Sequence, residues 1–153
     1  MSRRETLRDR PWPVPVRARM IGLVAIGGMA GTGARQALGL AVGPTGDFPL
    51  AIFLINLTGA FVLGALLETL LRSGPDEGWR RDLRLAIGTG FLGGYTTYSS
   101  LAVGVSQLLV HDRVLLGLGY GVSSVVLGVA AAGLGIVVGG LLSGRRVRVG
   151  EAR

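Results

Sequence analysis

Four long apolar runs occupy most of the chain, and short polar connections separate them. The runs cover residues 20–42, 49–71, 83–110 and 114–142. Each is at least as long as the roughly 20 residues that an α-helix needs to cross a hydrocarbon core about 30 Å thick. The pattern predicts an all-α membrane protein whose four transmembrane helices form one domain over residues 20–142.

The polar segments around these runs have the composition of connections and tails. Residues 43–48 and 72–82 combine glycine, proline and charge, which is typical of turns, and residues 111–113 form the shortest connection. We expect residues 1–19, which are rich in arginine and proline, to be a largely disordered basic arm. Residues 143–153 are expected to be a basic tail.

The arginines are distributed very unequally between the two sides of such a bundle. All 16 cationic residues are arginines, and 14 of them lie before the first run, around the second connection or after the last run. Four spans place these three regions on one side. The opposite side holds Arg113 alone, and Arg35 lies inside the first run. The positive-inside rule then predicts a multi-pass protein of the cell membrane with both termini in the cytoplasm.

Composition excludes several classes of function. The chain is 49% hydrophobic and 16% charged, which does not suit a soluble domain. It has no cysteine and a single histidine, His111, so no catalytic or metal-binding cluster is expected, and no enzyme. The net charge of +7 does not predict a nucleic-acid partner, because the arginines flank apolar runs instead of forming a polar face with aromatic residues.

Two polar side chains inside the apolar runs are candidates for function. An arginine such as Arg35 costs at least ~2.5 kcal/mol near the bilayer centre. It either extends to the outer interface or supplies a cation to a water-filled vestibule. Asn56, in the second run, either bonds to a neighbouring helix or directs its amide donor into an ion path.

The third run contains a predicted break at Gly93–Thr97. Residues 90–100 read Gly-Phe-Leu-Gly-Gly-Tyr-Thr-Thr-Tyr-Ser-Ser, and paired glycines followed by hydroxyl residues make a poor continuous helix. Unwound backbone at membrane depth occurs where it is buried in protein or lines a cavity, and its free carbonyls can hold ions. A simple kink is the alternative.

The polar groups of the runs are donors of hydrogen bonds, and no carboxylate lies in the middle of a run. This combination suits an anion, which also gains from the positive edges of aromatic rings. The donors include Asn56, Thr96, Thr97, Ser99, Ser100, Ser123 and Ser124.

In these residues the sequence resembles the Fluc family of fluoride channels, also called CrcB. Residues 90–100 resemble the long signature of the family's third helix, and the glycines that precede Arg35 resemble its first-helix motif. Asn56 followed by Gly59 is similar to the second-helix motif, and Tyr120 with Ser124 resembles the fourth more weakly. The resemblance covers all four runs.

The resemblance implies an antiparallel, dual-topology-type dimer with two pores that carries fluoride passively out of the cytoplasm and confers fluoride resistance. Arg35 is then a vestibule residue. Backbone carbonyls of Gly93 and Thr96 hold a structural sodium ion on the dimer axis. The implied fluoride pathway comprises Asn56, Tyr98, Ser99, Ser100, Leu101, Tyr120 and Ser124.

The chain also departs from the family pattern. Tyr98 and Leu101 stand where the family has two phenylalanines, Gly104 replaces a frequent carboxylate, and Gly128 replaces a serine. An antiparallel homodimer needs a chain that inserts both ways, whereas the arginines here favour one orientation. We therefore predict a heterodimer with a homologous subunit of opposite bias, in which one pore has decayed; a homodimer is the alternative.

Two other classes of membrane protein are alternatives to a fluoride channel. A small multidrug exporter requires a membrane-embedded carboxylate for proton exchange, and the first run has none. A membrane scaffold or assembly subunit without transport activity would keep the sodium motif but would tolerate replacement of Asn56.

Overall fold

A computed structural model describes the backbone of residues 14–150 and the side chains of residues 17–144. Within this part of the chain all regular structure is helical, as predicted. The third apolar run is divided into four elements, one of which is a π-helix. The elements are α1 (Val14–Val42), α2 (Leu50–Arg72), α3 (Trp79–Leu83), the π-helix η1 (Arg84–Leu92), α4 (Gly93–Tyr95), α5 (Tyr98–Val110) and α6 (Val114–Gly150).

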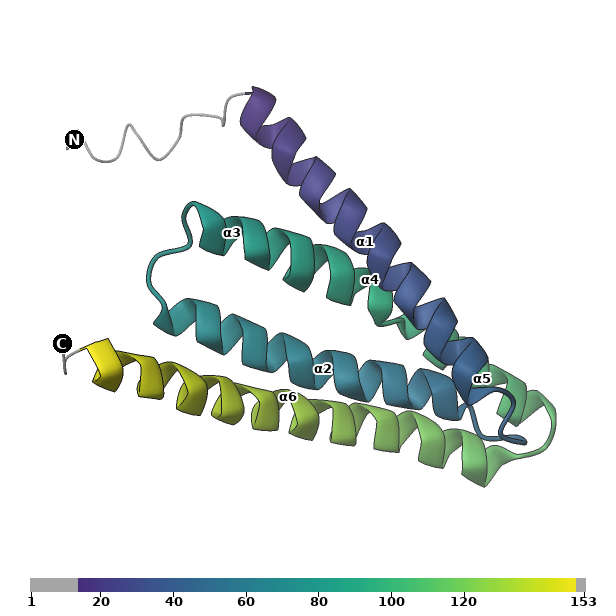
Figure 1. Cartoon of the computed structure of the whole chain (residues 1–153). Helices are drawn as coiled ribbons and strands as arrows, with labels where there is room; N and C mark the ends of the chain where they lie inside the picture. The colour runs from purple at the N-terminus through teal and green to yellow at the C-terminus, as the bar shows by residue number, and fades with distance from the viewer. Residues whose placement is uncertain (1–13, 151–153) are drawn as a thin grey trace, which may run out of the picture.

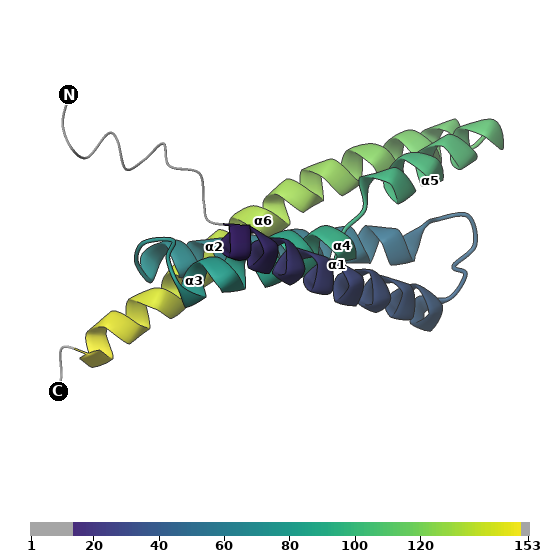
Figure 2. The same cartoon turned by 90° about the horizontal axis from the view of Figure 1, so that it is seen from above.

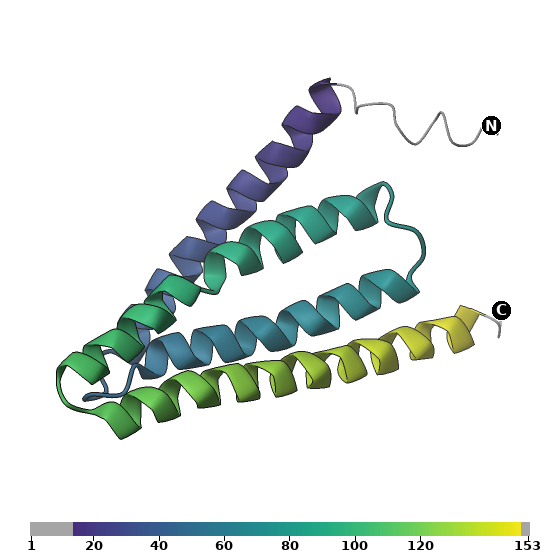
Figure 3. The ribbon, with the colours of Figure 1, turned by 180° about the vertical axis from the view of Figure 1, so that it is seen from behind.

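The elements form four rods that pass back and forth between two ends of the molecule (Figure 1). The start of α1, the connection 73–78 and the end of α6 lie at one end, here named the arginine-rich end. The connections 43–49 and 111–113 lie at the other, here named the Arg113 end. Helix α2 lies along α6, whereas α1 packs on η1 and α4 and diverges from α2 toward the arginine-rich end (Figures 1 and 3).

Two of the helices are long and apolar enough to cross a membrane, namely α2 and the part of α6 that covers Val114–Gly144. They correspond to the predicted spans 49–71 and 114–142, and each ends slightly later than predicted. Arg35 and Gln36 lower the apolar character of α1, and the third rod is divided, so that none of its single helices has the required length. The four-helix architecture is confirmed, with two membrane-span candidates among the described residues.

The first helix begins earlier than the sequence indicated. Disorder was expected over residues 1–19, but α1 begins at Val14, which corrects that expectation for residues 14–19. Pro15 lies in the first turn of the helix, where a missing amide hydrogen costs nothing because that turn has no backbone acceptor. Residues 1–13 lie outside the described part. The predicted basic tail continues α6 as far as Gly150, and residues 151–153 are not described.

Glycines allow the helix backbones to touch. A Cβ atom at Gly27 or Gly31 of α1 would overlap the carbonyl oxygen of Ala86 or Phe91 in η1. Gly135 of α6 meets the backbone of α2 in the same way. Such close approach supplies the van der Waals contact that holds helices together in lipid, where no hydrophobic drive exists. These glycines are therefore packing positions, where a larger residue would separate the helices.

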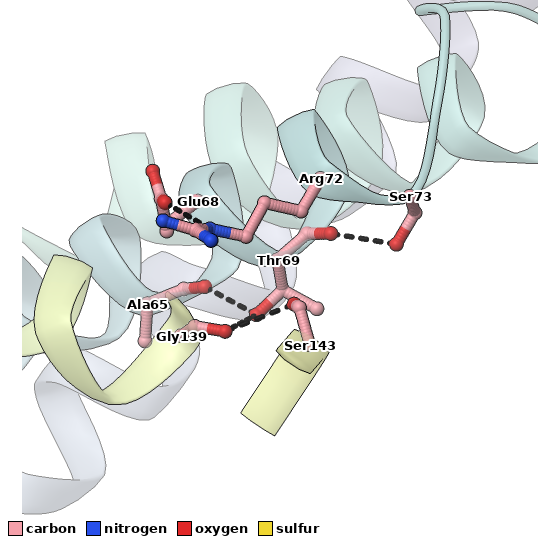
Figure 4. A network of polar contacts seen from close by, with 7 residues as sticks. All are labelled: Ala65, Glu68, Thr69, Arg72, Ser73, Gly139 and Ser143. Carbon is pink, nitrogen blue, oxygen red and sulfur yellow. Dashed lines mark hydrogen bonds and ion pairs between the residues drawn. The ribbon is translucent and has the colours of Figure 1, made fainter. Parts of the chain in front are cut away.

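Hydroxyl groups lie where α2 and α6 meet near the arginine-rich end (Figure 4), and that of Thr69 donates to the Ala65 carbonyl of its own helix at 2.7 Å. The hydroxyl of Thr69 lies 3.5 Å from the carbonyl oxygen of Gly139, at the limit of a hydrogen bond, and the buried Ser143 donates to the same oxygen at 2.9 Å. Arg72 donates to Glu68 one turn earlier on α2. The only carboxylate of this helix is therefore part of an ion pair at the end of the bundle.

An ion pair that responds to acid joins the connection between α2 and α3 to the start of η1. Arg84 donates hydrogen bonds to Asp76 from Nη2 to Oδ2 at 2.6 Å and from Nε to Oδ1 at 3.0 Å. This hydrogen bonding holds the pKa of Asp76 below its usual 3.8. A lowered pKa stabilises the fold above the pKa of the unfolded chain, and this contribution is lost as pH falls through the folded value. Half of the Asp76 side chain is exposed, so salt screens the effect.

We expect Asp76→Asn to reduce the loss of thermal stability that the parent protein undergoes below about pH 4. The variant should lose less because it has no carboxylate to protonate at this position. Melting curves in detergent between about pH 3 and pH 7 measure this difference in thermal stability. Glu77→Gln is the matched control, since Glu77 has no ion pair among the described residues. Equal acid sensitivity of the parent and Asp76→Asn would exclude this role.

Candidate functional site

The third rod loses helical conformation at two residues, Thr96 and Thr97. Their backbone angles are extended, with φ −77° and ψ 157° at Thr96 and φ −153° and ψ 119° at Thr97. Both residues lie inside the predicted break, but Gly93–Tyr95 is still helical, so the break is narrower than expected. Figure 2 shows α5 leaving this link at an angle to α4 and lying along the start of α6.

Asn56 of α2 fills the gap that the break leaves in the backbone hydrogen bonding. Its Nδ2 donates to the carbonyl oxygen of Thr97 at 3.0 Å, and its Oδ1 accepts from the amide of Thr97 at 2.9 Å. The side-chain amide thus pairs with a peptide group as a second backbone would. The backbone N–H and C=O of Thr97, which have no helical partners, are thus both hydrogen-bonded in a place where water is scarce. One hydrogen of the Asn56 amide has no partner among the described residues.

Gly59 leaves the space in which the break packs against α2. The methyl group of Thr96 occupies the space where a Cβ atom of Gly59 would be, and the Tyr95 ring lies beside it. Gly59 is one helical turn after Asn56, so one face of α2 carries both the amide that bonds to the break and the gap that receives it. This arrangement explains the combination of Asn56 and Gly59 in one motif.

The hydroxyl of Thr97 is the centre of a small network at the start of α5. It accepts from the amide of Ser100 at 3.2 Å, as an N-cap residue does, and donates to the Ser100 hydroxyl at 3.1 Å. The Ser99 hydroxyl lies 3.1 Å from the same oxygen. Since one hydroxyl has one hydrogen, Ser99 is the donor in that contact. The two predicted pathway serines are therefore oriented by Thr97.

Thr97→Val removes this network while keeping the shape of the side chain. We expect a loss of about 1–2 kcal/mol in the free energy of unfolding, because an N-cap hydrogen bond and its partners are lost. Thr97→Ser retains the hydroxyl and serves as the matched control. Thermal melting in detergent measures the difference, and equal midpoints for Val and Ser would contradict the capping role.

Four of the predicted pathway residues line one open groove. Asn56, Tyr98, Leu101 and Ser124 border a space of about 420 Å³ between α2, the break, α5 and α6. Gly128 also lines it and leaves its wall open. The Tyr98 side chain is 82% exposed, so the aromatic ring stands outside the single chain. The groove has no opposite wall within the described residues.

The remaining predicted residues are placed differently. Tyr120 is 1% exposed and packs its ring edge-to-face on Phe48, with the two centroids 5.3 Å apart. Ser124 donates to the Tyr120 carbonyl at 2.6 Å, so its hydroxyl hydrogen is engaged. Arg35 is half-buried on α1, which does not border the groove, and it has no recorded partner within the described residues.

Two carbonyl oxygens at the break are free to bind a cation. The helical partner of the Gly93 carbonyl would be the amide of Thr97, which bonds to Asn56 instead. The helical partner of the Thr96 carbonyl would be the amide of Ser100, which bonds to the Thr97 hydroxyl. Neither oxygen has another recorded bond among the described residues. Such oxygens are suitable ligands for a hard cation, although one chain supplies too few for a closed shell.

Comparison with known proteins assigns the chain to a family. A model of the CrcB-like protein family, described as camphor resistance (CrcB), matches residues 22–136. The chain belongs to the CrcB-like family. The match covers α2, the break and α5, and it includes all predicted pathway residues.

Curated relatives of this CrcB-like chain are named as ion channels. Fluoride-specific ion channel FluC 2 of Leifsonia xyli subsp. xyli is 44% identical over 95% of this chain and 97% of its own length. FluC 1 of Cutibacterium acnes is 43% identical over 83% and 90%, and FluC of Deinococcus radiodurans is 40% identical over 78% and 94%. Membership of a channel family confirms the expectation that the protein is a membrane protein and not an enzyme.

Two features of this CrcB-like site were not predicted from the sequence. Thr97 was considered only as one donor among several, although a threonine directly before a helix of serines and apolar residues is a recognisable N-cap signal. The π-helix over Arg84–Leu92 had no signal, since its sequence is as apolar and glycine-rich as the α-helices around it. Local π geometry is frequent near functional sites.

Proposed function

We propose that this CrcB-like protein is a subunit of a fluoride-selective channel that lets fluoride leave the cytoplasm passively. The observation that carries the proposal is the break in the third rod, held on α2 by Asn56 and bordered by a groove. The relatives named fluoride-specific ion channels support the choice of ion.

The chemistry of the groove supports an anion as its occupant. The second amide hydrogen of Asn56 is available as a donor, and the ring edge of Tyr98 carries partial positive charge. Acidic side chains are absent from the lining that the described residues form. A negative ion thus meets donors and ring edges without repulsion, whereas a cation has no charged ligand there. Ser99, Ser100, Tyr120 and Ser124 would continue this polar track, with Arg35 at a vestibule.

A second subunit would complete the groove. The exposed Tyr98 ring and the missing opposite wall support a dimer, because an apolar surface of this kind is a typical interface. An antiparallel partner would bring its own Gly93 and Thr96 carbonyls toward those of this chain. Four such oxygens around the dimer axis would hold a structural sodium ion.

The arginine distribution supports a heterodimer. Fourteen of 16 arginines belong to the arginine-rich side in the sequence, and only Arg113 belongs to the other. A chain inserted in one orientation needs a homologous subunit of the opposite orientation to form an antiparallel pair. Leu101 and Gly128 would then weaken one of the two paths, and the other path, to which this chain would contribute Asn56, would conduct.

Growth of a bacterium that lacks its own fluoride channels tests the proposed function. We expect the chain to restore growth in fluoride when a homologous subunit with opposite arginine bias is expressed with it, and to restore little alone. Omission of fluoride controls for general toxicity. No rescue by the chain, alone or paired, would favour a scaffold subunit and contradict the proposal.

Labelling of introduced cysteines tests the single orientation directly, since the chain has none of its own. Thr45→Cys reports the connection at the Arg113 end, and Glu77→Cys reports the one at the arginine-rich end. We expect a membrane-impermeant maleimide to label Thr45→Cys in intact cells and Glu77→Cys only after lysis. Partial labelling of both in intact cells would indicate dual topology and a homodimer.

A further inference from the structure

A second space, here named the end groove, lies at the arginine-rich end and shares no residue with the groove at the break. It has a volume of about 490 Å³ and is bordered by α2, the connection 73–78, the start of the third rod and Ile136 of α6. Its wall along α2 is apolar, since Leu67 and Leu71 line it, and Leu71 is 76% exposed. An exposed apolar wall of this kind is typical of a binding surface.

One positive charge at the polar end of the end groove is not neutralised. Glu68 pairs with Arg72 (Figure 4), and Asp76 pairs with Arg84, so both acidic residues of the described lining already have an arginine. Arg80 also lines the groove and has no recorded carboxylate partner among the described residues. With its ion pairs included, the polar end therefore carries a net positive charge.

The guanidinium of Arg80 is held by groups that do not cancel its charge. Its Nε donates to the carbonyl oxygen of Pro75 at 2.8 Å, and its Nη1 donates to that of Ser73 at 3.2 Å. The group also lies over the Trp79 ring, 5.7 Å from the centroid. Its Nη2 has no recorded partner within the described part of the chain. An oriented guanidinium with a donor to spare suits a phosphate group.

The end groove runs from the depth of a membrane interface toward the hydrocarbon region. Trp79 is 60% exposed beside Arg80, and tryptophan is enriched where a membrane meets water. Gly64, which also lines the groove, precedes Leu71 by seven residues of α2, a rise of about 10 Å. Helix α2 is long and apolar enough to span a membrane. The groove is thus polar at its interfacial end and apolar farther along α2.

The arginine-rich side as a whole favours anionic headgroups. In the sequence, the segments of this side contain 14 arginines and seven acidic residues. Basic segments next to a membrane span attract anionic lipids, which are abundant in the cytoplasmic leaflet. The local charge at Arg80 therefore lies in surroundings that concentrate the same class of lipid.

We propose that the end groove binds an anionic phospholipid of the bilayer. Its phosphate accepts a hydrogen bond from Nη2 of Arg80, and one acyl chain lies along Leu67 and Leu71. A free phosphate would leave the apolar wall open, a zwitterionic lipid would bring a cation with its phosphate, and a second copy in the same orientation would bring arginines toward Arg80. The binding does not depend on the proposed channel function, and only the choice of leaflet depends on the predicted orientation.

Fluorescence of Trp79 tests this binding in a membrane. Trp12 and Trp79 are the only tryptophans of the chain, so Trp12→Phe leaves one reporter beside Arg80. The full chain is placed in phosphatidylcholine vesicles with about 20% phosphatidylglycerol, and an equal amount of one lipid or the other is brominated close to its headgroup so that it quenches a neighbouring ring. We expect the quenching to give phosphatidylglycerol an affinity about fivefold above that of phosphatidylcholine, as one arginine near the headgroups provides.

Three variants separate the site from the general charge of this side. Arg80→Gln should abolish the preference for phosphatidylglycerol, whereas Arg80→Lys keeps the charge and should retain most of the preference. Arg17→Gln removes one charge from the exposed start of α1, which does not border the end groove, and should leave the preference unchanged.

Four results would overturn the proposal. Equal quenching by the two lipids would show no preference, and an equal effect of Arg17→Gln and Arg80→Gln would reduce any preference to surface charge. Quenching by neither lipid would show that protein, such as a second copy of the chain, covers the groove. Loss of the preference when sodium phosphate is added at constant ionic strength would assign the polar end to a free anion.

Discussion

Asn56→Asp is expected to lower fluoride efflux by about two to three orders of magnitude. The substitution keeps the acceptor that bonds to the Thr97 amide but replaces the donor that bonds to the Thr97 carbonyl. Two acceptors then face each other at the break, and a negative charge stands beside an anion path. Repulsion at about 4 Å and an intermediate dielectric is worth about 4 kcal/mol. Efflux from liposomes, followed with a fluoride electrode, measures the effect.

Asn56→Ala separates the two causes of this loss. It removes both hydrogen bonds to Thr97 but adds no charge, so we expect a lower melting temperature and a smaller loss of efflux than for Asp. Efflux of the Asp variant within about threefold of the parent would show that Asn56 does not border the path. An equal loss of fluoride efflux in Asn56→Ala and Asn56→Asp would show that the role of Asn56 is structural alone.

Gly31→Val is expected to prevent assembly of the folded chain, at a cost above about 4 kcal/mol. The added Cβ would overlap the Phe91 carbonyl oxygen and would lie 2.9 Å from the amide of Tyr95. Backbone atoms on both sides cannot rotate away, so α1 must separate from the third rod. The contact also supports the turn that precedes the break, and its loss would displace Thr96 and Thr97.

Gly33→Val is the matched control on the same helix. No atom beyond the neighbouring backbone of its own helix lies within 4 Å of its Cβ position, so only the small cost of a branched residue in a helix remains. Size-exclusion chromatography and thermal melting in detergent compare the two variants. Equal behaviour of Gly31→Val and Gly33→Val would show that α1 does not pack on η1 as described.

The sequence was sufficient for the architecture because bilayer thickness fixes the length of a span. The apolar runs became rods, and the connections 43–49 and 111–113 lie together at one end. The break was predictable from composition, since paired glycines followed by hydroxyl residues disfavour continuous helix. The packing of helices at glycines such as Gly27 and Gly135 was predictable, because only small residues let two helix backbones approach closely.

The details of the site depended on contacts between distant segments. That Asn56 pairs with the Thr97 peptide, 41 positions later, follows only once α2 and the third rod are side by side. The π-helix likewise accompanies the close approach of α1, which periodicity in one segment does not report. The burial of the Tyr120 ring against Phe48, with a hydroxyl that has no recorded partner among the described residues, also depends on a contact between distant segments.

The most direct test of the central claim is fluoride efflux from liposomes that contain this chain, alone and together with a homologous subunit of opposite arginine bias. We predict rapid efflux of fluoride, but not of chloride, from the paired sample, and its loss when Asn56→Asp is introduced into this chain. Absence of fluoride efflux from both samples, with the protein folded and inserted, would contradict the claim that the chain is a subunit of a fluoride channel.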